Sequence, residues 1–317
     1  PEREPAAFHQ AKQKALKRQE KDSFWKDIIY VTVPILIMLV FSIYGLPKIM
    51  EWLKFSHLPS GYQKTETRFF RVFYPSSKKE DVLELAKEGE AYLEWFLEDV
   101  GKRLGGFEKP KYHINLIFLD SHLDFRKFAV KELEKDLAFN GGYFNPLTGD
   151  IALVLGKDPA KNLRGLRHEL THYLLNRGGN MFASGFPAWL SEGLAIYFEK
   201  VEPDLEPWIY QTVGEENRIL PIAEVLSFSR ADFSALGNRK AYAYSALLVY
   251  LISQEPKFWN YLQETRWGRK KTLEDFYSYF GPTKEERKTL EQKWEILQNR
   301  VKEEYLKRKK QKRKKKE

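Results

Sequence analysis

The sequence contains no cysteine. This absence excludes disulfide frameworks, thiolate zinc sites, iron–sulfur clusters and cysteine nucleophiles. It does not fix the compartment, because a cysteine-free chain tolerates both oxidising and reducing surroundings. Glycine and proline are also few, with 19 and 15 of 317 residues, which excludes a collagen-like or low-complexity chain. The 22 Phe, 17 Tyr and 8 Trp exclude a chain that is disordered throughout.

The body of the chain carries almost no net charge, although the whole sequence carries +9. Residues 307–317 carry +8 and residues 1–27 carry +2, so residues 28–306 sum to −1. The basicity belongs to the two ends, and a basic binding face on a folded domain is therefore not implied. No nucleic-acid partner is expected.

Residues 28–47 lack any charged side chain. A helix of this length rises about 30 Å, the thickness of the hydrocarbon core of a bilayer, so we expect a transmembrane helix. A buried core helix is the alternative, and a cleaved signal peptide is disfavoured because no Ala-x-Ala site follows. Lys and Arg are more numerous before the span than after it, which predicts a cytoplasmic N-terminus and an extracytoplasmic remainder in the cell membrane.

Expected strands cluster early in the rest of the chain and expected helices late, which indicates an α+β domain. Alternating or continuous apolar runs predict strands at 67–74, 112–119, 143–144 and 151–155. The last two of these strands are expected to form a hairpin. Three- and four-residue apolar spacing predicts helices at 78–104, 121–138, 159–176, from Pro187 onward, 221–229, 240–254, 257–264, 272–280 and 283–306.

Residues 168–172 read His-Glu-Leu-Thr-His. On a helix, His168 and His172 project from one face and both imidazoles can reach one metal ion. Glu169 lies one step round, where it can contact a water on the metal and act as its general base. We therefore expect one Zn²⁺ per chain, held in part by the two histidines.

A catalytic zinc site needs a third protein ligand, and no histidine follows at close spacing. Residues 187–199 read PAWLSEGLAIYFE, in which Glu192 lies among apolar neighbours. A carboxylate in such a place is costly unless it is paired or binds a metal, so Glu192 is the predicted third ligand. The alternatives are a solvated Glu192 on an exposed face, or Glu199 as the ligand.

The two motifs, His168-Glu169-Leu170-Thr171-His172 and Trp189-Leu190-Ser191-Glu192-Gly193-Leu194-Ala195, resemble the gluzincin zinc metallopeptidases, in particular the bacterial, membrane-anchored peptidase MA-like group. The resemblance covers about residues 66–255 and implies a zincin-like, thermolysin-like domain with a small mixed sheet. It implies a peptide or protein substrate, ligation by His168, His172 and Glu192, and Glu169 as the base.

A later segment, Tyr242-Ala243-Tyr244-Ser245, resembles the Tyr-x-x-Ser segment of that group. The resemblance implies that Tyr242 stabilises the oxyanion, with Tyr244 as the competing position and a purely structural role as the alternative to both. One departure is Ile196, which stands where some gluzincins have an Asp that orients a ligand histidine. In such peptidases an edge strand pairs with the substrate, and residues 140–145 or 151–155 are candidates; the alternative is that both are merely sheet.

The expected organisation is a cytoplasmic basic tail (1–27), a transmembrane helix (28–47), a juxtamembrane linker (48–65), a zinc metallopeptidase domain (66–306) and a disordered basic tail (307–317). The last segment has two interpretations: it binds anionic lipid headgroups or surface polymers, or it is solvated without a partner.

Two other functions compete with a peptidase. One is a catalytically inactive binding or scaffolding protein with a peptidase fold. The other is a structural membrane anchor in which the motif is accidental.

Overall fold

The computed structural model describes residues 35, 55, 58–107, 109–133, 141–177, 186–199, 205–234, 239–268 and 272–314. The chain divides into two compact units, Pro1–Leu58 and Pro59–Glu317, and the sheet and its covering helices belong to the second. Within the described residues, no helix combines the length and apolar character needed to cross a membrane. The span predicted at 28–47 lies outside them, except for Ile35.

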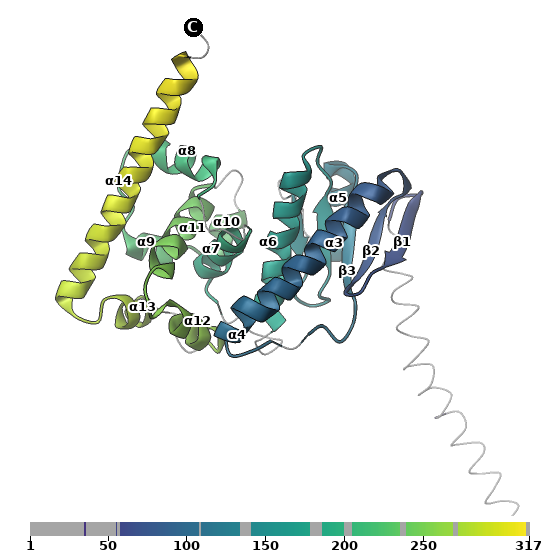
Figure 1. The fold of residues 1–317 in the computed structure, drawn as a ribbon, viewed down its shortest axis with the longest axis horizontal. Coiled ribbons are helices and arrows are strands. Elements are labelled where there is room, and N and C mark those ends of the chain that lie inside the picture. Colours follow the sequence, from purple (N-terminus) through teal and green to yellow (C-terminus); the bar gives the residue numbers. More distant parts are fainter. Residues whose placement is uncertain are drawn as a thin grey trace, which may run out of the picture. The chain divides into compact units, whose positions relative to one another are not determined.

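The described strands form one mixed sheet in the order β1-β2-β3-β5-β4 (Figure 1). The two outer pairs, β1–β2 and β4–β5, are antiparallel, and the inner pairs are parallel. β4 therefore forms one edge of the sheet and β5 lies inside it. The strands are β1 (Tyr62–Glu66), β2 (Phe70–Pro75), β3 (Ile114–Leu119), β4 (Gly142–Phe144) and β5 (Ile151–Val154). The fold is α+β, as the order of expected elements predicts.

β1 corrects the predicted linker at 48–65, because it pairs with β2 along its whole length. Its residues, YQKTE, are mostly polar, and none of them is fully buried. An edge strand of this kind gives little hydrophobic alternation, which is why the sequence pattern did not reveal it.

The two faces of the sheet are covered by different helices. α3 (Lys79–Trp95) and α6 (Pro159–Arg177) pack on the face that carries Phe70 and Leu153, while α5 (His122–Leu133) packs on the other. Gly89 allows α3 and α6 to approach, since a Cβ there would lie 2.8 Å from the Leu166 side chain. The face with Phe70 and Leu153 holds most of the hydrophobic core, and packing in this core fixes the position of α6.

The hairpin predicted from the turn sequence NPLTGD is confirmed. The Asn145 side chain accepts a hydrogen bond from the Leu147 amide (3.0 Å), and the Asn145 amide donates to Asp150 O (2.8 Å). Gly149 adopts φ +77°, a conformation that favours glycine. This turn places β4 along the free edge, over α6.

The second half of the unit is helical and surrounds α11 (Arg239–Ser253), which packs against α7, α8 and α9. A Cβ on Gly193 of α7 would lie 2.7 Å from Ser245 O, so this glycine sets the close approach of α7 to α11. The other described helices of this half are α7 (Ala188–Phe198), α8 (Pro207–Glu215), α9 (Ile222–Leu226), α10 (Arg230–Ser234), α12 (Phe258–Arg266), α13 (Leu273–Phe280) and α14 (Lys284–Lys314).

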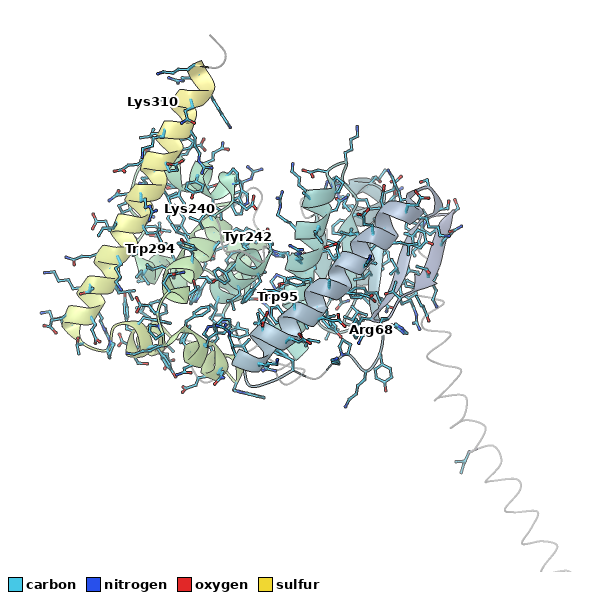
Figure 2. The ribbon with its side chains drawn as sticks, viewed as in Figure 1. Arg68, Trp95, Lys240, Tyr242, Trp294 and Lys310 are labelled. Atoms are coloured by element: carbon cyan, nitrogen blue, oxygen red, sulfur yellow. The ribbon has the colours of Figure 1, made fainter. Side chains whose placement is uncertain are left out.

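α14 corrects the predicted disorder of residues 307–317 as far as residue 314, because the helix continues to Lys314 (Figure 1); residues 315–317 lie outside the described part of the chain. Trp294 (labelled in Figure 2) and Gln298 anchor it, because both donate hydrogen bonds to Leu220 O. Further along the helix, the Tyr305 ring packs on Gly214 of α8. Lys and Arg are good helix formers, and cations are favoured at a helix C-terminus. The basic composition suggested a disordered segment, but the segment continues a helix whose earlier turns are packed against the rest of the unit.

Candidate metal centre

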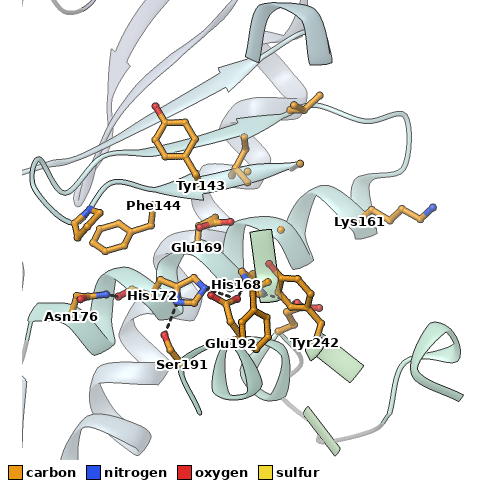
Figure 3. A pocket seen from close by; sticks show the side chains of 18 of the residues that line it. Tyr143, Phe144, Lys161, His168, Glu169, His172, Asn176, Ser191, Glu192 and Tyr242 are labelled. Atoms are coloured by element: carbon orange, nitrogen blue, oxygen red, sulfur yellow. Dashed lines mark hydrogen bonds and ion pairs between the residues drawn. The ribbon is translucent and has the colours of Figure 1, made fainter. Parts of the chain in front are cut away.

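α6 presents two different faces to its surroundings. Leu166, Leu170 and Leu174 are buried in the core, while His168 and His172, four residues apart, lie on the cleft side of the helix (Figure 3). Their Nε2 atoms are 3.1 Å apart. The predicted helical spacing of the two histidines therefore places both imidazoles at one point.

α7 brings the third group. Glu192 Oε2 lies 3.5 Å from His168 Nε2 and 3.4 Å from His172 Nε2 (Figure 3). In a tetrahedral site with metal–ligand bonds of about 2.0–2.1 Å, ligand atoms are separated by about 3.3–3.4 Å. The observed separations fit this geometry, so the three side chains could hold one metal ion. Glu192, predicted as the third ligand, is the carboxylate that faces the Nε2 atoms of both histidines, whereas Glu199 contacts only Nδ1 of His168.

The second nitrogen of each histidine has its own partner. His168 Nδ1 lies 2.9 Å from Glu199 Oε1, and His172 Nδ1 lies 3.3 Å from Ser191 Oγ. A group bonded to Nδ1 fixes the ring orientation and, by accepting the Nδ1 proton, leaves Nε2 free to ligate. Both imidazoles are thus oriented with Nε2 toward Glu192.

Glu199 makes a contact with His168 that the sequence analysis did not predict. It stands seven residues after Glu192, hence on nearly the same face of α7, and it orients His168 where Ile196 cannot. Arg167 donates from Nη1 to Glu199 O (3.3 Å), which holds the end of α7 against α6. The seven-residue spacing was the available signal, but it was interpreted only as an alternative ligand.

The charges at the centre influence one another strongly. Burial lowers the pKa of His168, but the Glu192 and Glu199 carboxylates outweigh it and hold that pKa well above its ordinary value. Burial raises the pKa of Glu192, yet the two histidines outweigh it and hold that pKa well below its usual range. A proton on His168 would therefore compete with a metal ion for this position.

Glu169 lies between α6 and the edge strand (Figure 3). Burial raises its pKa above the ordinary value for a carboxylate. A Cβ on Gly142 would lie 3.2 Å from Glu169 Oε1, so this glycine leaves room for the carboxylate beside β4. A buried carboxylate with a raised pKa, next to a metal site, is suited to accept and return a proton.

The two competing tyrosines are separated by the fold. Tyr242 lines the cleft beside His168 and Glu192, and burial together with the Glu192 and Glu169 carboxylates raises its pKa (Figure 3). Tyr244 is fully buried, and its ring centroid lies 6.2 Å from that of Trp294. Only Tyr242 is therefore placed to donate a hydrogen bond into the cleft.

A cleft of about 1080 Å³ contains all of these groups. α6 forms its floor, β4 one wall, and α7, α10 and α11 the other. The predicted site residues His168, Glu169, His172, Glu192 and Tyr242 all line it. Residues that the sequence analysis did not assign to the site also line it: Ser191, Asn176, Phe186, Arg230 and Phe233.

Comparisons of the sequence with protein-family models and with curated proteins gave no match.

Proposed function

We propose that the chain is a zinc metallopeptidase with a zincin-like domain. The observation that supports this most is the convergence of two imidazoles and one carboxylate at the spacing of a tetrahedral site. In that site zinc would act as a Lewis acid. It would polarise the substrate carbonyl and lower the pKa of a water, so that the water could lose a proton and attack the carbonyl carbon. Nitrogen and carboxylate ligands without thiolates suit zinc in a catalytic role.

The other steps belong to the protein's own side chains. Glu169 accepts the proton of the attacking water and returns it to the leaving amine, a task that suits a carboxylate with a raised pKa. Tyr242 is protonated at neutral pH, since the ordinary pKa of tyrosine is already alkaline and burial raises it further, and it donates a hydrogen bond to the developing oxyanion.

The free edge of β4 supports pairing with an extended peptide. Gly141 O accepts from Val154 N and Asn145 N donates to Asp150 O, so residues 141, 143 and 145 pair inward. In an antiparallel ladder the alternate residues, Gly142 and Phe144, then direct their backbone groups to the open edge. Because β5 lies inside the sheet, the alternative edge at 151–155 is not available. N-methylation of the substrate amides beside the scissile bond should raise KM if this pairing occurs.

We also propose that the span at 28–47 anchors the enzyme, with the catalytic unit extracytoplasmic. The basic end of α14 would then contact anionic lipid headgroups or surface polymers. Lys310 and its neighbours extend from the helix beyond the contacts with α8 (Figure 2). The topology would be tested by adding protease to sealed vesicles and measuring which end of the chain is cleaved. The role of the tail would be tested by comparing how readily salt releases the protein from membranes with and without residues 307–317.

The decisive experiment compares the full chain with Glu169→Gln in detergent micelles. Zinc content and cleavage of a peptide library are measured for both. One zinc in both proteins, with cleavage only by the wild type, supports the peptidase. Zinc in both without cleavage by either would favour a binding or scaffolding protein, and no zinc in either would remove the basis of the proposal.

A further inference from the structure

The candidate metal centre is supported by α3, a helix of which no described residue lines the cleft. α3 packs against α6 (Figure 1). The end of α7 also contacts it: the Phe198 ring centroid lies 6.3 Å from that of Trp95 (labelled in Figure 2) and 5.3 Å from that of Phe96. Glu199, the partner of His168, directly follows Phe198. The position of this carboxylate therefore depends on contacts made outside the cleft.

Arg167 connects α6 with both of the other helices. It precedes His168 and is therefore turned by about 100° from it around α6. Its Nη1 donates to Glu199 O (3.3 Å) at the end of α7, and its Nη2 lies 3.9 Å from Glu88 Oε2 of α3. Its guanidinium carbon lies 5.6 Å from the centroid of the Tyr92 ring, also on α3, within the range of a cation–π interaction. One planar guanidinium can make all three contacts at once.

A buried pair of hydroxyl groups fixes the backbone from which this side chain extends. Thr171 Oγ1 donates to Arg167 O (2.8 Å), which uses its one proton. Tyr92 OH must therefore be the donor in the 2.7 Å hydrogen bond that it shares with Thr171 Oγ1. Both side chains are buried, where an unpaired hydroxyl is costly, so this bond holds α6 in one rotation against α3.

The surroundings of Arg167 strengthen its contact with α7. Its side chain is only 18% exposed, so water does not readily take the place of Glu199 O. A hydrogen bond from a charged donor is stronger than one between neutral groups, and more so when it is partly buried. This bond restrains the residue whose carboxylate lies 2.9 Å from His168 Nδ1.

We propose that Arg167, braced by α3, is a positioning residue of the metal centre. It holds the last turn of α7 so that the Glu199 carboxylate stays on His168 Nδ1 and the imidazole keeps Nε2 directed at the metal position. Arg167 itself does not line the cleft and acts only through Glu199. This inference rests on the zinc site of the proposed function.

The test is a double-mutant cycle on the zinc affinity of the full chain, measured by competition with a chromophoric chelator. Arg167→Gln should weaken zinc binding about fivefold, the effect of one hydrogen bond. In a Glu199→Ala background no carboxylate remains to be positioned, so the same substitution should change the affinity by a factor of about one. A residue that only stabilised the fold would reduce the affinity equally in both backgrounds. Equal reduction, or no reduction in either, would overturn the proposal and leave the zinc site intact.

Arg164→Gln is the matched control. Arg164 is also on α6, but its Nη1 lies 3.8 Å from Glu206 Oε1, beside the start of α8. Its removal should leave the zinc affinity unchanged. If Arg167→Gln does not fold, Arg167→Lys takes its place in both backgrounds, because it keeps the charge but loses the planar fork.

Failure of the zinc site itself would be recognised separately. If the wild type binds no zinc, the proposed metal site fails, and NMR of the metal-free chain labelled with ¹⁵N-histidine decides the role of Arg167. The Nδ1 proton of His168 should then exchange with water about fivefold faster in Arg167→Gln than in the wild type, and at the wild-type rate in Arg164→Gln. Equal exchange in the wild type and in Arg167→Gln would overturn the proposal.

Discussion

α6 and α7 both carry side chains of the candidate metal site, but the two helices position them in different ways. α6 buries leucines against the sheet and leaves a polar face on the cleft, so His168 and His172 follow from ordinary amphipathicity. α7 is apolar nearly all round and is wedged between α6 and α11. Glu192 is therefore placed by tertiary packing, with Gly193 in close contact with α11. The comparison shows that the candidate site combines a pair of histidines placed by local helical spacing with a carboxylate whose position depends on the packing of the whole helical half.

Loss of the α7 ligand should have the largest effect. Glu192→Ala should weaken zinc binding by more than about a hundredfold, because a direct ligand matters more than an outer partner. Competition with a chromophoric chelator measures the affinity. Glu295→Ala, an exposed position on α14, is the matched control. Unchanged zinc affinity in Glu192→Ala would mean that α7 does not supply a ligand.

Loss of the outer partner on α7 should have a smaller effect. Glu199→Gln keeps the size of the side chain but removes the charge that faces His168 Nδ1. Zinc affinity should fall by about 10- to 100-fold, with ligand number unchanged. An affinity equal to that of the wild type would show that His168 needs no orienting carboxylate.

Zinc affinity should also depend on pH. The pKa of His168 is held well above its ordinary value by the Glu192 and Glu199 carboxylates, so in the metal-free protein a proton on this imidazole competes with zinc. Apparent affinity should rise with pH by up to about tenfold per unit until that pKa is passed. Glu199→Gln should move this rise to lower pH, and chelator competition at several pH values measures it. A zinc affinity that does not change with pH would contradict competition between zinc and a proton on His168.

The same group affects the stability of the metal-free protein. Its folded pKa exceeds the unfolded value, so its stabilising contribution is complete below about pH 6.5 and is lost as pH rises through the folded pKa.

The packing of the two helices is tested by glycine substitutions, with the smallest expected effect on metal binding. Gly193→Ala would place a Cβ 2.7 Å from Ser245 O and should cost about 1–3 kcal/mol of unfolding free energy. On α6, Gly165→Ala would make an ordinary contact of 3.5 Å with Leu153 and should change stability little. Chemical denaturation measures both. Equal effects would show that α7 is not packed more tightly than α6.

Sequence reasoning succeeded where the signal is local. The histidine pair, the helix that carries it and the hairpin with its NPLTGD turn follow from spacing and turn chemistry within a few residues. Glu192 was predicted to join the histidines because a carboxylate in an apolar helix needs a partner, and it does lie beside both of them. The α+β class follows from the order of the elements.

Sequence reasoning left alternatives open, or missed the feature, where long-range contacts decide. Tyr242 and Tyr244 stand two residues apart on α11, and only the packing of Tyr244 on Trp294 shows which of them faces the cleft. The partnership of Glu199 with His168 and the pairing of β1 with β2 likewise depend on neighbours distant in the chain. The short helices α8 and α10 give too few turns for a clear period.

The central claim is that His168, His172 and Glu192 hold one zinc ion. An anomalous difference map, from crystals of the zinc-loaded protein measured at the zinc absorption edge, tests it most directly. The account predicts a single peak within about 2.0–2.2 Å of both Nε2 atoms and a Glu192 oxygen. A peak bound elsewhere, or no peak at saturating zinc, would contradict it.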